Sequence, residues 1–145
     1  MLYLDSSALV KVYAVEPGHD SMAGLLTKHA GLLFTSVVTY AEVLSAMTRG
    51  HRSGRITDRD YSAAKLRFRQ DWREILVIEL REDVLSDVER LIESHGLRGF
   101  DAVHLCSACW LDEPRLSFAC FDQRLRAAAA AEKLAVVPDL SEESA

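Results

Sequence analysis

Two aspartates follow short apolar stretches of the chain in the same way. Residues 2–4 lead directly into Asp5, and residues 116–121 lead directly into Asp122. Both stretches are typical of buried strands, and each precedes a stretch typical of a helix. Because ligands bind beyond the carboxyl ends of parallel strands, the two carboxylates should share one crevice if the strands are neighbours. The alternative that stays open is that each aspartate only caps the following helix.

Two further acids lie close to predicted helix starts. Glu42 lies one turn into a helix predicted from residue 38, and Asp101 opens a helix predicted to run to about residue 110. Each has a local alternative, because Thr39 and Glu42 fit a capping box and Asp101 could cap its own helix. The chain therefore offers four acids that either cap helices or meet in one crevice.

The chemistry of such a crevice would depend on cations. Four carboxylates close together repel one another strongly and stay ionised only if cations neutralise them. Ligand sets made only of oxygen suit Mg²⁺ or Mn²⁺ rather than zinc. Two such ions, roughly 4 Å apart, could clamp a phosphodiester. The shared placement of the four acids is therefore consistent with a metal-dependent nuclease, which acids alone do not prove.

The elements that must hold these acids alternate along the chain. Short apolar stretches predict strands at residues 2–4, 32–35, 75–80, 116–121 and 136–137. Helices are predicted between them, at residues 6–13, 22–29, 38–49, 101–110 and 123–133, with two more after Thr57 and before Gly96. Continuous apolar strands between helices are typical of a parallel sheet with helices on both faces. We therefore expect an α/β fold in one domain, residues 1–145, from which a helical hairpin at residues 49–72 projects.

The composition is that of an ordinary globular protein. The chain has 145 residues, of which 49% are hydrophobic and 27% are charged. No apolar run approaches the roughly 20 residues of a membrane span, and the first residues lack the pattern of a signal peptide. We therefore expect a cytoplasmic protein that does not contact membranes.

Three cysteines, Cys106, Cys109 and Cys120, stand in apolar surroundings, and their odd number does not indicate a disulfide framework. Cys106 and Cys109 form a C-x-x-C pattern inside a predicted helix, whereas redox pairs usually lie at a helix N-terminus. We expect buried thiols. The alternative is a redox pair, or a zinc site with His104 as a third ligand.

The charge of the chain is unevenly distributed. The net charge is −5, yet residues 49–73 hold eight Lys or Arg and only three Asp or Glu. A basic segment on an acidic body can bind a polyanion or an acidic partner. The alternative is an ordinary solvated helix face.

Four blocks of the sequence resemble the signature blocks of PIN-domain ribonucleases, most closely the VapC-type toxins of bacterial toxin–antitoxin pairs. They are LDSSALVK at residues 4–11, SVVTYAEV at 36–43, LRGFDAVHL at 97–105 and FDQRL at 121–125. The resemblance implies a PIN-like fold with a central parallel sheet of about five strands. It also implies metal-dependent cleavage of RNA, with Mg²⁺ or Mn²⁺ as cofactor, and a cognate antitoxin as partner. A homodimer formed through a helical surface is expected as well.

The resemblance assigns roles to individual residues. Asp5, Glu42, Asp101 and Asp122 match the acidic quartet of the family. Ser7 matches a small polar position that helps to orient the first acid, and Ser36 matches a hydroxyl that could cap the helix bearing Glu42. The chain departs from the family at Cys120, where Thr or Ser usually precedes the fourth acid by two residues. A thiol is a weaker donor than a hydroxyl, which puts the positioning of Asp122 in question.

Two other functions are considered. The first is a PIN fold kept only for binding, against which the intact quartet argues. The second is a phosphoacceptor receiver-type domain, which is also small and acid-rich at strand ends. Such domains carry an acidic pair at the first strand and a Lys near the last strand, whereas here Asp5 is followed by serines.

Overall fold

A parallel sheet of five strands forms the centre of the molecule, in a computed structural model that describes residues 1–29 and 31–141. The sheet order is β3-β2-β1-β4-β5, and the strands are β1 (Leu2–Leu4), β2 (Leu33–Ser36), β3 (Leu76–Ile78), β4 (Ser117–Ala119) and β5 (Ala135–Val137). All neighbouring strands are parallel, so the predicted sheet is confirmed. β3 and β4 are shorter than predicted, because the chain leaves the sheet after Ile78 and after Ala119.

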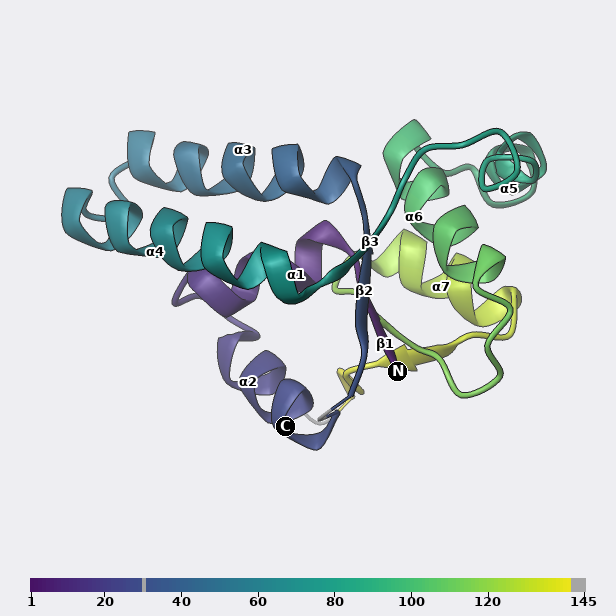
Figure 1. The fold of residues 1–145 in the computed structure, drawn as a ribbon, viewed down its shortest axis with the longest axis horizontal. Coiled ribbons are helices and arrows are strands. Elements are labelled where there is room, and N and C mark those ends of the chain that lie inside the picture. Colours follow the sequence, from purple (N-terminus) through teal and green to yellow (C-terminus); the bar gives the residue numbers. More distant parts are fainter. Residues whose placement is uncertain (30, 142–145) are drawn as a thin grey trace.

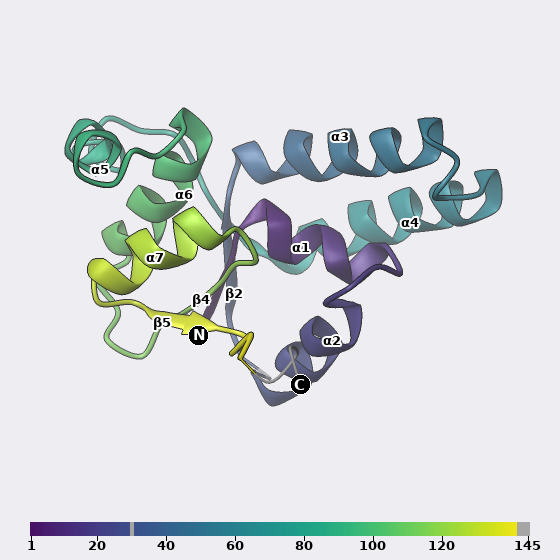
Figure 2. The ribbon, with the colours of Figure 1, turned by 180° about the vertical axis from the view of Figure 1, so that it is seen from behind.

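Helices cover both faces of this sheet (Figures 1 and 2). Four helices lie on one face, α1 (Ser6–Tyr13), α2 (His19–Lys28), α3 (Val38–Arg52) and α4 (Asp58–Asp71). Three lie on the other, α5 (Val88–His95), α6 (Gly99–Trp110) and α7 (Gln123–Ala131). A short 3-10 turn, η1 (Trp72–Glu74), leads from α4 into β3. In the described part of the chain, no helix has the length and apolar character needed to cross a bilayer.

The side chains of β1 divide the interior into two apolar cores. Tyr3 packs in one core with Leu105 of α6 and Leu125 of α7. Leu2 and Leu4 pack in the other core, with residues of α1, α2 and α3. This division follows from the alternation of side chains along a strand. The central strand, which ends at Asp5, is therefore held between two packed layers.

The predicted helical hairpin is present and consists of α3 and α4, which extend away from the sheet (Figure 1). α3 continues three residues beyond its predicted end, to Arg52. The glycine at position 50 lets Ile56 of the connecting loop pack against this helix, because a Cβ there would lie 2.7 Å from Cδ1 of Ile56. Thr57 caps α4 as predicted, since its hydroxyl accepts a hydrogen bond from the Asp60 amide at 3.1 Å.

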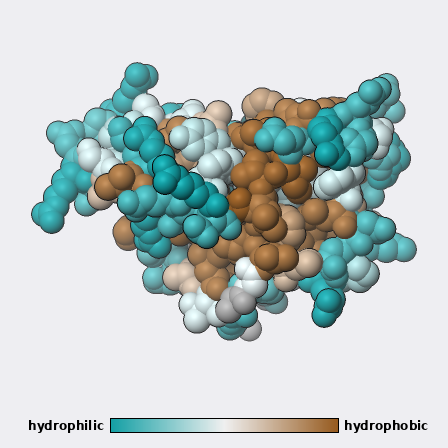
Figure 3. Space-filling model, viewed as in Figure 1, coloured by the Kyte–Doolittle hydropathy of each residue, from teal (hydrophilic) through white to brown (hydrophobic). Residues whose placement is uncertain are grey.

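An apolar area lies at the open edge of the sheet. Figure 3 shows apolar side chains gathered in the middle of one face, between the hairpin and the α5 region. Leu76 of β3, Leu80 and Trp110 of α6 are each more than 40% exposed. Leu76 and Trp110 border a hollow of about 270 Å³ that also touches Phe34 and Val84. Within the described residues β3 pairs only with β2, so its outer edge is free.

The three cysteines are free thiols. Cys106 and Cys120 are buried, as expected, and Cys109 is partly buried. The Cys106 thiol donates a hydrogen bond to the Val84 carbonyl oxygen at 2.9 Å, which places it in the packing between α6 and the loop before α5. Burial raises the pKa of Cys109 to about 11, and a thiol with so high a pKa is a poor nucleophile at neutral pH.

Candidate active site

Asp5 and Asp122 lie at the same edge of the sheet, as predicted. They follow the neighbouring strands β1 and β4, in which Leu4 is paired with Ala119. Each also caps the next helix: Asp5 Oδ1 accepts a hydrogen bond from the Ala8 amide at 2.9 Å, and Asp122 Oδ1 accepts one from the Leu125 amide at 2.8 Å. Capping and a shared location are therefore compatible here.

Ser7 connects the first strand to the segment that precedes Asp122. Its hydroxyl donates to the Asp5 carboxylate, with Oγ at 2.8 and 3.0 Å from the two oxygens. The same oxygen accepts a hydrogen bond from the Phe121 amide at 2.9 Å. Because one side chain contacts both segments, it fixes the orientation of Asp5 relative to the end of β4.

Cys120 contacts backbone and Ser7 rather than the Asp122 carboxylate. Its thiol donates to the Asp122 carbonyl oxygen at 3.6 Å, and Ser7 Oγ lies 3.9 Å from its sulfur. Burial, and then the charge of Asp5, raise the pKa of this thiol well above its usual range. The Asp122 carboxylate is oriented by the Leu125 amide instead.

Asp101 does not open its helix, contrary to the prediction. α6 begins at Gly99 with Arg98 as its N-cap, so Asp101 is the third helical residue and does not cap the helix. Its side chain is half-buried. Burial, followed by the charge of Asp122, raises its pKa, with smaller contributions of the same sign from Asp5 and Glu42. The other three predicted acids therefore lie within electrostatic reach of Asp101.

The capping box predicted as an alternative for Glu42 is absent. Val37 is the N-cap of α3, and Thr39 lies inside the helix, where its hydroxyl accepts a hydrogen bond from Thr35 at 2.8 Å. Glu42 Oε1 instead lies 2.7 Å from Nε2 of His104. Ser36 does not cap the helix either, because it is the last residue of β2 and its buried hydroxyl has no partner in the described chain.

His104 is the residue whose role the sequence did not indicate. It was considered only as a zinc ligand beside the cysteines, yet its ring contacts Glu42 through Nε2 and the Tyr3 hydroxyl through Nδ1, at 3.0 Å. The ring is 1% exposed. One available signal was its position three residues after Asp101 in the same helix, which places both side chains on one face.

The donor set fits a hard divalent cation chemically. In residues 1–29 and 31–141, none of the four acids forms an ion pair with Lys or Arg, and the ion pair of Glu42 with His104 is the only one they form. Burial raises the pKa of Asp5, although the His104 charge and the Ala8 and Ser7 hydrogen bonds oppose this. Carboxylate oxygens without a protein cation are the ligands that Mg²⁺ and Mn²⁺ prefer. The described side chains contain no group of three or more His, Cys, Asp or Glu with ready-made metal-site geometry.

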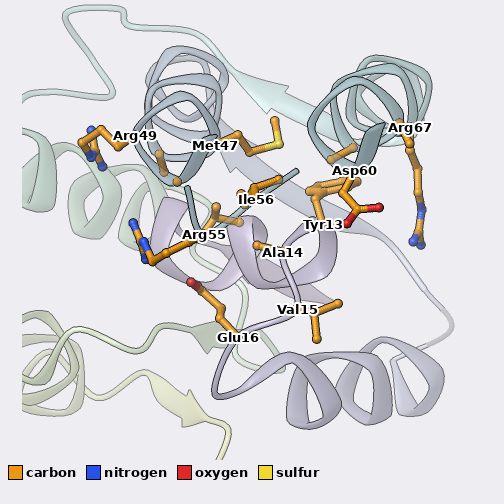
Figure 4. A pocket seen from close by; sticks show the side chains of 15 residues that line it. Tyr13, Ala14, Val15, Glu16, Met47, Arg49, Arg55, Ile56, Asp60 and Arg67 are labelled. Carbon is orange, nitrogen blue, oxygen red and sulfur yellow. The ribbon is translucent and has the colours of Figure 1, made fainter. Parts of the chain in front are cut away.

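A groove that none of the four acids lines lies between α1, α3 and α4. It encloses about 550 Å³, and Figure 4 shows Tyr13, Met47 and Ile56 lining it with charged residues at its rim. Among those charged residues are Glu16, Arg49, Arg55, Asp60 and Arg67. Apolar walls with charges of both signs at the rim suit a peptide segment better than a bare polyanion.

Comparison with known proteins places this chain in one family. The model of the PIN domain matches residues 2–135. Two Mycobacterium tuberculosis proteins, Ribonuclease VapC45 and Ribonuclease VapC49, are each 33% identical to the chain over 138 residues, covering 95% of both chains.

Solved structures show the same fold at lower sequence identity. A toxin–antitoxin complex from Klebsiella pneumoniae matches with a TM-score of 0.69 and 17% identity, covering 95% of this chain and 97% of that chain. VapC20 from Mycobacterium tuberculosis, described as a toxin that cleaves the sarcin-ricin loop, matches with a TM-score of 0.68 and 16% identity. It covers 88% of this chain and 95% of its own.

Proposed function

The chain belongs to the PIN-domain family, and from this membership we propose that it is a metal-dependent endoribonuclease, the toxin of a toxin–antitoxin pair. Its relatives are named ribonucleases, and several structures of the same fold are toxin–antitoxin complexes. The observation that carries the proposal is the cluster of four acids at the carboxyl edge of the sheet, which no Lys or Arg of the described chain neutralises.

Each of the four acids has a role in holding the cations. Asp5 and Asp101 are the principal ligands for Mg²⁺ or Mn²⁺, Glu42 completes the set, and Asp122 supports a second ion. Ser7 holds the Asp5 carboxylate. When bound, the cations would offset the negative charge that develops on the scissile phosphate. The protein contributes by fixing the carboxylates on two strand ends and two helices that pack against one sheet.

The basic hairpin supplies affinity for the RNA substrate. Arg52 and Arg59 are exposed at its tip. Exposed arginines bind phosphates without regard to sequence, so this contribution falls as salt concentration rises. The antitoxin occupies the groove between α1, α3 and α4, where apolar walls meet charges of both signs.

We also propose a homodimer that forms through the apolar area at the β3 edge. Leu76 and Trp110 are exposed there beside the free edge of β3. In a twofold dimer, the same area of a second copy of the chain would pack against this one. Leu76→Lys should convert a dimer to a monomer in light scattering after gel filtration. A variant that elutes with the mass of the wild type would contradict this contact.

The direct test is cleavage of RNA in the presence of Mg²⁺ or Mn²⁺. Wild type should cut, and Asp5→Asn and Asp101→Asn should not. Asp58→Asn serves as the matched control, since Asp58 is an exposed acid that pairs with His51 at the far end of α3. Equal cutting by wild type and both site variants would overturn the proposed mechanism.

The alternatives make different predictions. A PIN fold kept only for binding would hold an antitoxin tightly and bind no divalent ion in calorimetry. The receiver-type alternative is wrong, because receiver domains have the sheet order 2-1-3-4-5, whereas this sheet has the order β3-β2-β1-β4-β5.

A further inference from the structure

A buried chain of hydrogen bonds links the centre of the sheet to Glu42. The Tyr3 hydroxyl lies 3.0 Å from His104 Nδ1, and His104 Nε2 lies 2.7 Å from Glu42 Oε1. The three residues come from β1, α6 and α3, and His104 is separated by more than 60 residues from each partner. The contact therefore joins α3 on one face of the sheet to α6 on the other (Figure 1).

Both ring nitrogens of His104 lie within hydrogen-bond distance of a partner. An ionised carboxylate only accepts hydrogen bonds, so Nε2 of His104 donates to Glu42. The Tyr3 hydroxyl lies within hydrogen-bond distance of the other ring nitrogen, Nδ1. His104 is thus held at both ring nitrogens, and this arrangement resembles the outer-shell contacts that orient ligands around metal sites.

Nothing else in the described chain holds the Glu42 carboxylate. Its hydrogen bond to His104 is the only one it forms, and its side chain is 25% exposed. Asp5 and Asp122 differ from it, because backbone amides at helix starts fix both of them. Without His104, repulsion from the neighbouring acids would favour Glu42 conformations that point into solvent.

We propose that His104 is the positioning residue of the acidic cluster, and that it fixes the Glu42 carboxylate for a divalent cation while Tyr3 orients its ring. The inference rests on the proposed function, since it concerns the same carboxylates. The opposing interpretation is a buried histidine that only stabilises packing between α3 and α6. The two differ in what a variant changes besides stability.

The test compares two histidines that make the same contact. His95 Nε2 lies 2.7 Å from Glu132 Oε1, remote from the acids, so His95→Leu is the matched control for His104→Leu. Manganese affinity is measured by calorimetry without RNA, kcat and KM are measured on a short RNA, and thermal melting reports folding. His104→Leu should lower Mn²⁺ affinity and kcat by about 10- to 100-fold with little change in KM, whereas His95→Leu should lower only Tm.

Two further variants separate positioning from packing. His104→Gln keeps an amide donor near Nε2 and should restore most of the Mn²⁺ affinity lost in His104→Leu. In a Glu42→Gln background, His104→Leu should cause no further loss, because its effect acts through Glu42. If His104→Leu does not fold, Tyr3→Phe and His104→Gln decide the question. Of these two variants, Tyr3→Phe should lose more Mn²⁺ affinity, and its loss should be at most about tenfold.

The outcomes distinguish this inference from the proposed function. Wild type that binds Mn²⁺ but cuts no RNA would remove the proposed function, and the Mn²⁺ affinities of the variants would still decide the role of His104. Additive losses in the Glu42→Gln background, or Mn²⁺ affinity in His104→Leu and Tyr3→Phe equal to that of wild type, would overturn the inference.

Discussion

Two groups of carboxylates in this protein are treated in opposite ways. Glu132 of the α5–α7 contact accepts hydrogen bonds from Arg90 at 3.0 and 2.9 Å and from His95 at 2.7 Å, and these bonds lower its pKa to about 2. At the edge of the sheet, burial raises the pKa of both Asp5 and Asp101, and no Lys or Arg of the described chain pairs with them. The chain supplies its own cations where an acid stabilises the fold. Where it supplies none, we propose that an external cation binds.

The largest expected effect comes from removing an acid at the sheet edge. Asp101→Asn should lower kcat on RNA by more than about 100-fold, because substitution of outer-shell residues alone typically costs 10- to 100-fold. Asp101 is the acid whose charge interacts with all three others. Single-turnover cleavage in Mn²⁺ measures the change, and activity within tenfold of wild type would contradict the assigned role.

A contrasting effect is expected in the α5–α7 contact. Glu132→Gln should leave kcat unchanged and destabilise the fold by about 1 kcal/mol, or roughly 3–5 °C in Tm, because the arginine and histidine lose their shared anion. Thermal melting and the RNA assay on the same samples provide the measurement. A loss of activity without a loss of Tm would erase the distinction between the two groups.

The positions of the acids could be predicted only in part from the sequence. Asp5 and Asp122 follow apolar strands, and a local pattern was enough to place both at one edge. Asp101 was wrongly placed at a helix start, because its helix begins two residues earlier at Gly99, where no side-chain cap marks the boundary. The bond between Glu42 and His104 joins residues 62 positions apart, so no local pattern could reveal it.

The fold was predictable for a related reason. The strands are mostly apolar, and both sheet faces are covered, so periodicity and composition are sufficient to indicate a parallel sheet. Interactions that depend on three-dimensional packing were not predictable. The Ser36 hydroxyl, which has no partner among the described residues, is an example, since its sequence position resembles a helix cap while Val37 takes that place.

The pH dependence of stability should have opposite signs for the two groups. The pKa of Glu132 is lowered, so its contribution is complete above its ordinary value of 4.5 and is lost as pH falls toward 2. The pKa of Asp101 is raised above its ordinary value of 3.8, so its ionisation destabilises the fold as pH rises through the raised pKa. In chemical unfolding, the deficit of Glu132→Gln should therefore shrink in acid.

The same titration measures the second half of this prediction. Asp101→Asn should be more stable than wild type at pH 7 and equal to it below about pH 3.8. Melting curves of wild type and both variants at several pH values would check the signs. Parallel curves for all three proteins would show that the two groups do not differ.

The smallest effect is expected at Cys120. Cys120→Ser restores the hydroxyl typical of the family, yet it should change kcat by no more than about twofold, since the Leu125 amide already orients the Asp122 carboxylate. The RNA assay measures this change in kcat. Ser7→Ala is the comparison, and it should lower kcat more, because Ser7 contacts Asp5 directly. A tenfold gain for Cys120→Ser would show that the thiol limits the site.

The difference between the two groups of carboxylates is tested most directly by the effect of Mn²⁺ on thermal stability. A ligand at 100 times its Kd stabilises the folded state by about 2.7 kcal/mol, so Mn²⁺ should raise the Tm of wild type and of Glu132→Gln by several degrees. Asp101→Asn should show no such rise. An equal rise in Asp101→Asn, or no rise in wild type, would contradict the assignment of the sheet-edge acids as the cation site.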